Sequence, residues 1–214
     1  LPSLPASAVE ALRLMEDREV SADRLQRVIG KDQSLAAQIL KFSNSAMYCL
    51  QRQVSTLSHA IAILGLDTLR SIIVAASIRT VFYSGRKAGH SLPLHLLWQH
   101  AWGAGVAAPV VARHARYRDT DEAFTCGLMH DLGKLVMLSK HAPAYVEIIR
   151  GVERGEGRFH DLEQANFGYS HAQVGALLAT KWSFPQQLVE AILHHHDLAA
   201  APEYSKLAAI TDVA

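Results

Sequence analysis

Apolar residues recur at helical spacing along almost the whole chain. Leu25, Val28 and Ile29 share one face of a short segment, and Leu35 and Ile39 begin the same pattern in the next segment. The run Ile72-Ile73-Val74 would suit a buried strand, but no comparable run is available to pair with it. The pattern therefore predicts an all-α fold built from several short helices.

Local signals set the ends of these helices. Ser7 and Glu10 form a capping box, Ser21, Asp32 and Asp67 are predicted N-caps, and glycines at 30, 65 and 85 are predicted stops. The expected helices span 7–15, 21–29, 32–42, 56–64, 68–82, 92–114, 120–138, 143–151, 170–182 and 185–195, with a last one from about residue 203.

A polar segment with two glycines, residues 84–92, is the best linker in the chain. It predicts an N-terminal helical subdomain over 1–86 and a second helical subdomain over 87–214. The chain begins at Leu1 without methionine and stops inside an apparently helical stretch, so we expect a fragment of a longer protein.

Charge and cysteine content exclude several classes of protein. Residues 1–89 have a net charge of +4 and residues 90–214 a net charge of −3, without a dense basic run, so a dedicated nucleic-acid binder is not favoured. Two cysteines without a CxxC pair exclude a disulfide scaffold and a cysteine-based zinc finger. No apolar run reaches the roughly 18 residues of a membrane span, and no signal peptide is present, so we expect a cytoplasmic protein.

Histidine is unusually abundant and unevenly distributed. The chain has 12 histidines, of which His59 alone precedes residue 90. His130 and Asp131 are adjacent, and on a helix they would lie about 100° apart and lean into one cavity. Lys134 would lie one turn beyond His130, where a cation beside a metal suits a phosphate group. The alternative is a buried, hydrogen-bonded histidine beside a helix-capping aspartate.

Four further positions extend this candidate site. His100 lies in an otherwise apolar helix and needs a polar partner. The alternative is a core histidine that is hydrogen-bonded and binds no metal, which would give the same sequence pattern. His171 follows the N-cap Ser170 in a first turn, where an exposed histidine is the alternative. Three consecutive histidines span roughly 200° of helix, so His195 and His196 can flank one site while the third points elsewhere. Helix-end histidines could instead interact with the helix dipole.

One aspartate near the C-terminus is a further candidate ligand. Asp212 lies among small apolar residues, where a carboxylate is costly unless it is paired or bound to a metal.

Taken in order, these residues resemble the HD superfamily of metal-dependent phosphohydrolases. More specifically, nearly the whole chain resembles an HDOD domain, the HD-related output domain of bacterial signalling proteins. The motifs with that resemblance are Leu1-Pro2-Ser3-Leu4-Pro5, Asp32-x-x-Leu35, Ile39-Leu40-x-x-Ser43-Asn44-Ser45, Ala60-Ile61-x-x-Leu64-Gly65-x-x-x-Leu69-Arg70, Trp98-x-His100, Gly127-Leu128-Met129-His130-Asp131-Leu132-Gly133-Lys134, His171-Ala172-x-Val174-Gly175-Ala176, Trp182-x-x-Pro185 and Ala191-Ile192-x-x-His195-His196.

The resemblance implies a dinuclear metal site of Fe, Mn or Zn. One metal would be held by His100, His130, Asp131 and Asp212. Asp131 would bridge to a second metal held by His171, His195 and His196, and Lys134 would contact substrate phosphate. The related HD-GYP cyclic-di-GMP phosphodiesterases follow their histidine pair with a Gly-Tyr-Pro segment. Residues 197–204 contain no glycine, so that substrate loop is absent here.

Two functions follow from this resemblance. The first is a regulatory output domain of a bacterial signal-transduction protein, working with a fused sensor or receiver domain or with separate signalling partners. The alternative is a metal-dependent phosphohydrolase that acts on a nucleotide or a cyclic dinucleotide, with Asp131 and Lys134 as catalytic residues.

Overall fold

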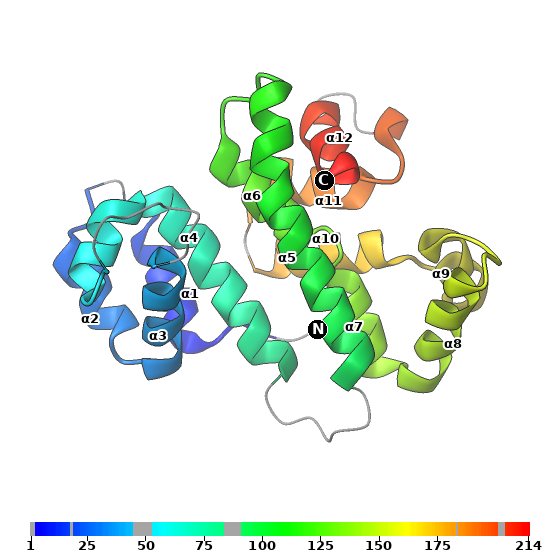
Figure 1. Ribbon diagram of the computed structural model, residues 1–214, viewed down its shortest axis with the longest axis horizontal. Coiled ribbons are helices and arrows are strands. Elements are labelled where there is room, and N and C mark those ends of the chain that lie inside the picture. Colours follow the sequence, from blue (N-terminus) through cyan, green and yellow to red (C-terminus); the bar gives the residue numbers. More distant parts are fainter. Residues whose placement is uncertain (1–2, 18, 45–52, 84–90, 183, 201–203) are drawn as a thin grey trace. The chain divides into compact units, whose positions relative to one another are not determined.

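The computed structural model describes residues 3–17, 19–44, 53–83, 91–182, 184–200 and 204–214 (Figure 1). Within these ranges every regular element is a helix, which confirms the all-α prediction. The chain divides into two compact units, Ser3–Ser84 and Gly85–Ala214. Most of the linker expected over 84–92 lies outside the described residues.

The first unit is a small helical bundle with its own core. Leu25, Ile29, Ile39, Leu69 and Ile73 are completely buried in it. Burial of each such side chain stabilises the folded state by roughly 1.5–3 kcal/mol, so this core can hold short helices together. Its helices are α1 (Ala6–Leu14), α2 (Ala22–Ile29), α3 (Gln33–Ser43) and α4 (Leu57–Tyr83).

The caps of this unit confirm three predictions and overturn one. Ser21 and Asp32 accept the backbone N–H groups of Arg24 and Leu35, as N-caps do. α4 is bent by 111° at Gly65, whose φ is +72°, so two helices meet there as predicted. The capping box at Ser7 was wrong, because α1 begins at Ala6 and the Ser7 hydroxyl instead donates to Asp32. The side chain of Asp67, a predicted cap, lies outside the described residues.

The second unit, Gly85–Ala214, packs its helices around α5 and α10. α5 lies along α6, α7 packs against α8 and α10, and α10 packs against α11 (Figure 1). This packing brings the α6–α7 junction close to the start of α10 and the end of α11. The helices are α5 (Ser91–His114), α6 (Thr120–Met129), α7 (Leu132–Lys140), α8 (Ala142–Glu153), α9 (Phe159–Phe167), α10 (His171–Lys181), α11 (Gln186–His194) and α12 (Ser205–Val213), with a 3-10 turn η3 (Leu198–Ala200).

Two sequence predictions fail in this unit. The helix expected over 120–138 is broken at His130 and Asp131, between α6 and α7. The residues on both sides of the break are buried on every face of their helices. The sequence therefore has no one-sided apolar pattern whose shift would mark the break. Helix α9 was missed because its one fully buried residue is Glu163, so it has almost no apolar periodicity.

Among the described residues, no single helix is both long and apolar enough to cross a membrane. The two halves of α4 pass that test only when they are taken together, across their bend.

A close backbone contact at Gly133 fixes how α7 meets α10. A Cβ atom there would lie 1.9 Å from the carbonyl oxygen of His171, whereas a Cβ at Gly103 on α5 would meet nothing within 4 Å. We expect Gly133→Ala to lower the free energy of unfolding by roughly 1–3 kcal/mol through overpacking. Gly103→Ala, the matched control, should raise it by roughly 0.5–1 kcal/mol, since alanine favours helix. Urea unfolding of both variants measures this, and a Gly133→Ala variant as stable as wild type would contradict the contact.

Candidate metal centre

The carboxylate of Asp131 lies at the middle of the candidate site. Asp131 is the residue before α7 and is 3% exposed. Its Oδ2 atom lies 3.1 Å from Nε2 of His100, 3.5 Å from Nε2 of His130 and 2.6 Å from Nζ of Lys134. One oxygen of this carboxylate therefore faces two imidazoles and an ammonium group.

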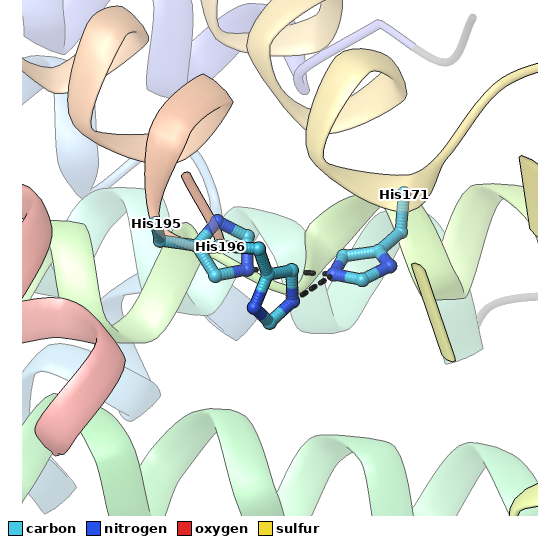
Figure 2. Close-up of side chains that lie close together, drawn as sticks. All are labelled: His171, His195 and His196. Carbon is cyan, nitrogen blue, oxygen red and sulfur yellow. Dashed lines mark hydrogen bonds between the residues drawn. The ribbon is translucent and has the colours of Figure 1, made fainter. Parts of the chain in front are cut away.

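The other oxygen faces a second group of histidines. Asp131 Oδ1 lies 3.3 Å from Nε2 of His171 and 3.9 Å from Nε2 of His195. His171, the first residue of α10, turns its ring toward His195 and His196 at the end of α11, with Nε2–Nε2 distances of 3.4 and 3.0 Å (Figure 2). The carboxylate thus separates two sets of ligand atoms, and within each set the atoms lie within 4.8 Å of one another.

Two of these rings are oriented by the ends of their own helices. Nδ1 of His130 lies 2.6 Å from the carbonyl oxygen of Gly127, and Nδ1 of His195 lies 2.7 Å from that of Ile192. A carbonyl oxygen can only accept, so each Nδ1 holds a proton and donates it. Both histidines directly follow a helix, where free carbonyl groups are available for such bonds.

The third ring is oriented by a buried carboxylate that the sequence did not reveal. Glu163 on α9 is completely buried, and its Oε2 lies 2.6 Å from Nδ1 of His171 and 2.7 Å from the backbone nitrogen of that residue. Its other oxygen accepts from the hydroxyl of Tyr145. Glu163 therefore orients His171 with its Nδ1 proton pointing away from the centre. No sequence signal marks Glu163, because a glutamate in a polar segment is usually exposed.

Burial keeps His130, His195 and His196 neutral near pH 7. It lowers the pKa of His130, and it lowers the pKa of His195 to about 2, with the neighbouring His130 adding to the effect. Burial and the nearby His171 lower the pKa of His196 to about 4. With the proton on Nδ1 and no second proton, Nε2 of His130 and of His195 presents a bare lone pair to the centre.

The charge of Asp131 is retained despite its burial. Burial alone would raise the pKa of Asp131, but the neighbouring His130 and Lys134, together with a hydrogen bond from His100, hold this pKa well below its usual range. Among the described residues, Oδ1 of Asp131 is a buried oxygen without a hydrogen-bond donor. A buried carboxylate oxygen surrounded by imidazole lone pairs is an arrangement that a divalent cation satisfies.

These donors fit a divalent metal of the first transition series. Imidazole nitrogen with carboxylate oxygen and no thiolate suits Fe, Mn or Zn. His100, His130 and Asp131 would hold one ion, and Asp131 with His171, His195 and His196 would hold the other.

The structure does not bring every predicted ligand together. Asp212 is exposed, and its Oδ1 lies 3.8 Å from Nδ1 of His196, outside both groups of ligand atoms formed by the described residues. The reason is the packing of α12, which buries Leu207, Ala208 and Thr211 and turns Asp212 toward solvent. The assignment of Asp212 to the ion of His100 therefore lacks geometric support.

Lys134 differs from its expected placement on one face with His130. The helix breaks between the two residues, so Lys134 does not lie one helical turn after His130. Its ammonium group instead pairs with the carboxylate of Asp131. Its Nζ also lies 4.3 Å from the centre of the Phe159 ring on α9. The cation is thus held, almost fully buried, at the edge of the centre.

The lowered histidine pKa values predict how the stability of the metal-free protein depends on pH. Below pH 6.5 His195 takes up a proton in the unfolded chain but stays neutral in the folded protein. The free energy of unfolding should therefore fall as the pH drops from 6.5 to 4.5. His195 alone should contribute a slope of up to about 1.4 kcal/mol per pH unit.

Chelator-treated protein unfolded in urea at several pH values measures this slope. His195→Asn should reduce the slope, whereas the exposed His95→Asn on α5 should leave it unchanged. Equal slopes in wild type and His195→Asn would show that His195 protonates freely in the folded state.

Comparison with solved structures places this fold among known proteins. A protein from Shewanella amazonensis SB2B named "Putative phosphohydrolase" is 28% identical, with a TM-score of 0.82 over 99% of this chain and 74% of that one. An HDOD domain protein with unknown function from Geobacter sulfurreducens is 26% identical, with a TM-score of 0.81 over 100% of this chain and 72% of that one.

Sequence comparison agrees with the structural one. An uncharacterized protein of Treponema pallidum (strain Nichols) is 26% identical over 207 residues, which are 96% of this chain. This chain spans only 39% of the length of that curated relative. The family model of the HDOD domain matches residues 1–198. The chain therefore belongs to the HDOD domain family.

Proposed function

We propose that this chain is a metal-binding output domain of a bacterial signal-transduction protein, with two divalent ions bridged by Asp131. The observation that supports it most strongly is that the two carboxylate oxygens of Asp131 face different histidines. Oδ2 faces Nε2 of His100 and His130, while Oδ1 faces Nε2 of His171. A carboxylate that bridges two ions with one oxygen on each would have this arrangement.

The regulatory role follows from where the ligands originate. They come from α5, the α6–α7 junction, the start of α10 and the end of α11, which are distant in sequence. Metal binding would tie these four places together, so occupancy would control how tightly the helices pack. Such a domain would pass its state to a fused sensor or receiver domain, or to a separate signalling partner, in the cytoplasm.

A metal-dependent phosphohydrolase is the second candidate function, and one observation favours it. His100, Asp131 and Lys134 border a cavity of about 410 Å³, so a phosphate ester of a nucleotide or cyclic dinucleotide could reach the centre. When bound, the ions would polarise a phosphoryl oxygen and activate a water molecule. Lys134 would add a positive charge for the phosphate.

Elemental analysis of purified protein tests the metal centre directly. Wild type grown in metal-replete medium should contain nearly two equivalents of metal, and Asp131→Ala should lose most of it because both ions share that ligand. Asp197→Ala, an exposed aspartate beside the histidine run, is the matched control and should retain its metal. Wild type without metal would refute the centre.

The same preparations distinguish the two functions. Metal-loaded wild type is incubated with a panel of phosphodiesters that includes cyclic dinucleotides, and released phosphate or nucleotide is measured. Turnover that disappears in His130→Ala supports the phosphohydrolase. No turnover with the metal loaded leaves the regulatory role.

Glu163 should matter to metal affinity although it does not reach the metal. Glu163→Gln can no longer accept all the hydrogen bonds that orient His171, so we expect metal affinity to fall by about 10- to 100-fold. Glu147→Gln, an exposed residue of α8, is the control and should bind metal as wild type does. Competition with a chromogenic chelator measures both. An unchanged affinity in Glu163→Gln would contradict the orienting role.

A further inference from the structure

The cavity beside the centre has one polar end and long apolar walls. Its polar end is formed by His100, Asp131 and Lys134, and Glu153 is its other charged lining residue. A volume of about 410 Å³ is within the range of small-molecule sites. The remaining lining residues are Pro93, Leu96, Leu97, Ile149, Val152 and Phe159.

Helix α5 gives the cavity a direction. His100 lies at the centre, Leu96 and Leu97 lie one turn earlier, and Pro93 lies one turn before those. The seven steps along the helix from His100 back to Pro93 correspond to a rise of about 10 Å. The cavity therefore changes from charged to apolar over a distance that a small extended group can fill.

The polar end of the cavity contains a cation, Lys134, that is paired with Asp131. Lys134 is 7% exposed, and its Nζ is shared between the carboxylate of Asp131 and the face of Phe159. With metal bound to the Asp131 carboxylate, this nearly buried ammonium group at the end of an apolar cavity would favour an anionic head such as a phosphate.

The walls favour an aliphatic group over a nucleobase. A base needs hydrogen-bond partners along its edges, and the backbone groups of Leu96, Leu97 and Ile149 are already paired inside helices. Among the described residues, Glu153, an exposed residue at the end of α8, is the single charged side chain that lines the cavity away from the centre.

We propose that this cavity binds the aliphatic part of an alkyl phosphate monoester, with the phosphate at Lys134 and the metal centre. This deepens the proposed function by naming a ligand class. It depends on the proposed centre only for the binding of the phosphate head, since the apolar walls act with or without metal.

Titration calorimetry with butyl, hexyl and octyl phosphate tests the proposal, with inorganic phosphate as the reference. Each buried methylene should increase affinity by about three- to fourfold, or about a hundredfold from butyl to octyl. The chain-length series is run on metal-loaded and on chelator-treated protein. A dependence on chain length in both, without an effect of metal, would refute the metal centre and leave the cavity assignment intact.

Two variants and a control locate the binding. Leu96→Ser replaces a wall residue that is 50% exposed, and Leu177→Ser replaces a leucine of α10 that is 62% exposed and does not line the cavity. We expect Leu96→Ser to weaken octyl phosphate by about tenfold and to leave inorganic phosphate unchanged, while Leu177→Ser changes neither. Val152→Trp fills the cavity and should abolish the dependence on chain length, with its fold checked by circular dichroism.

Three outcomes would overturn the proposal. The first is equal affinity across the alkyl series. The second is equal weakening of octyl phosphate by Leu96→Ser and Leu177→Ser. The third is tighter binding of AMP or a cyclic dinucleotide than of octyl phosphate, lost in Leu96→Ser, which would assign the cavity to a base.

Discussion

The second unit depends on the placement of one buried carboxylate at a break between two helices. Asp131 could not keep its charge in this interior without compensation, and Lys134 and a hydrogen bond from His100 supply it. His130 and Asp131 lie at the break between α6 and α7, where their side chains approach to 3.5 Å between Nε2 and Oδ2. The backbone contact at Gly133 then sets the start of α10 beside that point. Helix termination, close packing and electrostatics are therefore parts of one arrangement.

The three most buried histidines reach the same orientation by two routes. His130 and His195 each donate to a carbonyl three residues earlier, so the helix end that needs capping also fixes the ring. His171 stands at a helix start, where no such carbonyl is available, and a carboxylate from another helix replaces it. This difference explains why Glu163 is buried with three hydrogen bonds, and it makes a charged residue part of the contact between α9 and the rest of the unit.

The sequence predicted the features that depend on local chemistry. Helical periodicity gave the all-α fold, and the caps at Ser21 and Asp32 and the bend at Gly65 follow from side chains and glycine at those positions. Prediction from the sequence failed for features that depend on tertiary packing. The α6–α7 break lies inside a segment that is buried on every side, and α9 shows no apolar face. The burial of Glu163 and the exposure of Asp212 depend on which face each helix buries. The neighbouring residues in the sequence do not determine that face.

The ligands of the centre differ in their exposure to solvent, and this affects both candidate functions. His171 and His195 are almost fully buried, whereas the side chain of His100 is 54% exposed and borders the cavity. A ligand in the cavity therefore approaches the set of His100, on the side where Lys134 is bound to Asp131 Oδ2, while His196 is the exposed member of the other set. An ion at that set would share this oxygen with the ammonium group, and repulsion between the two cations would favour an anion near Lys134. In the proposed function, metal and anion would thus favour each other's binding, whether the anion is a signal or a substrate.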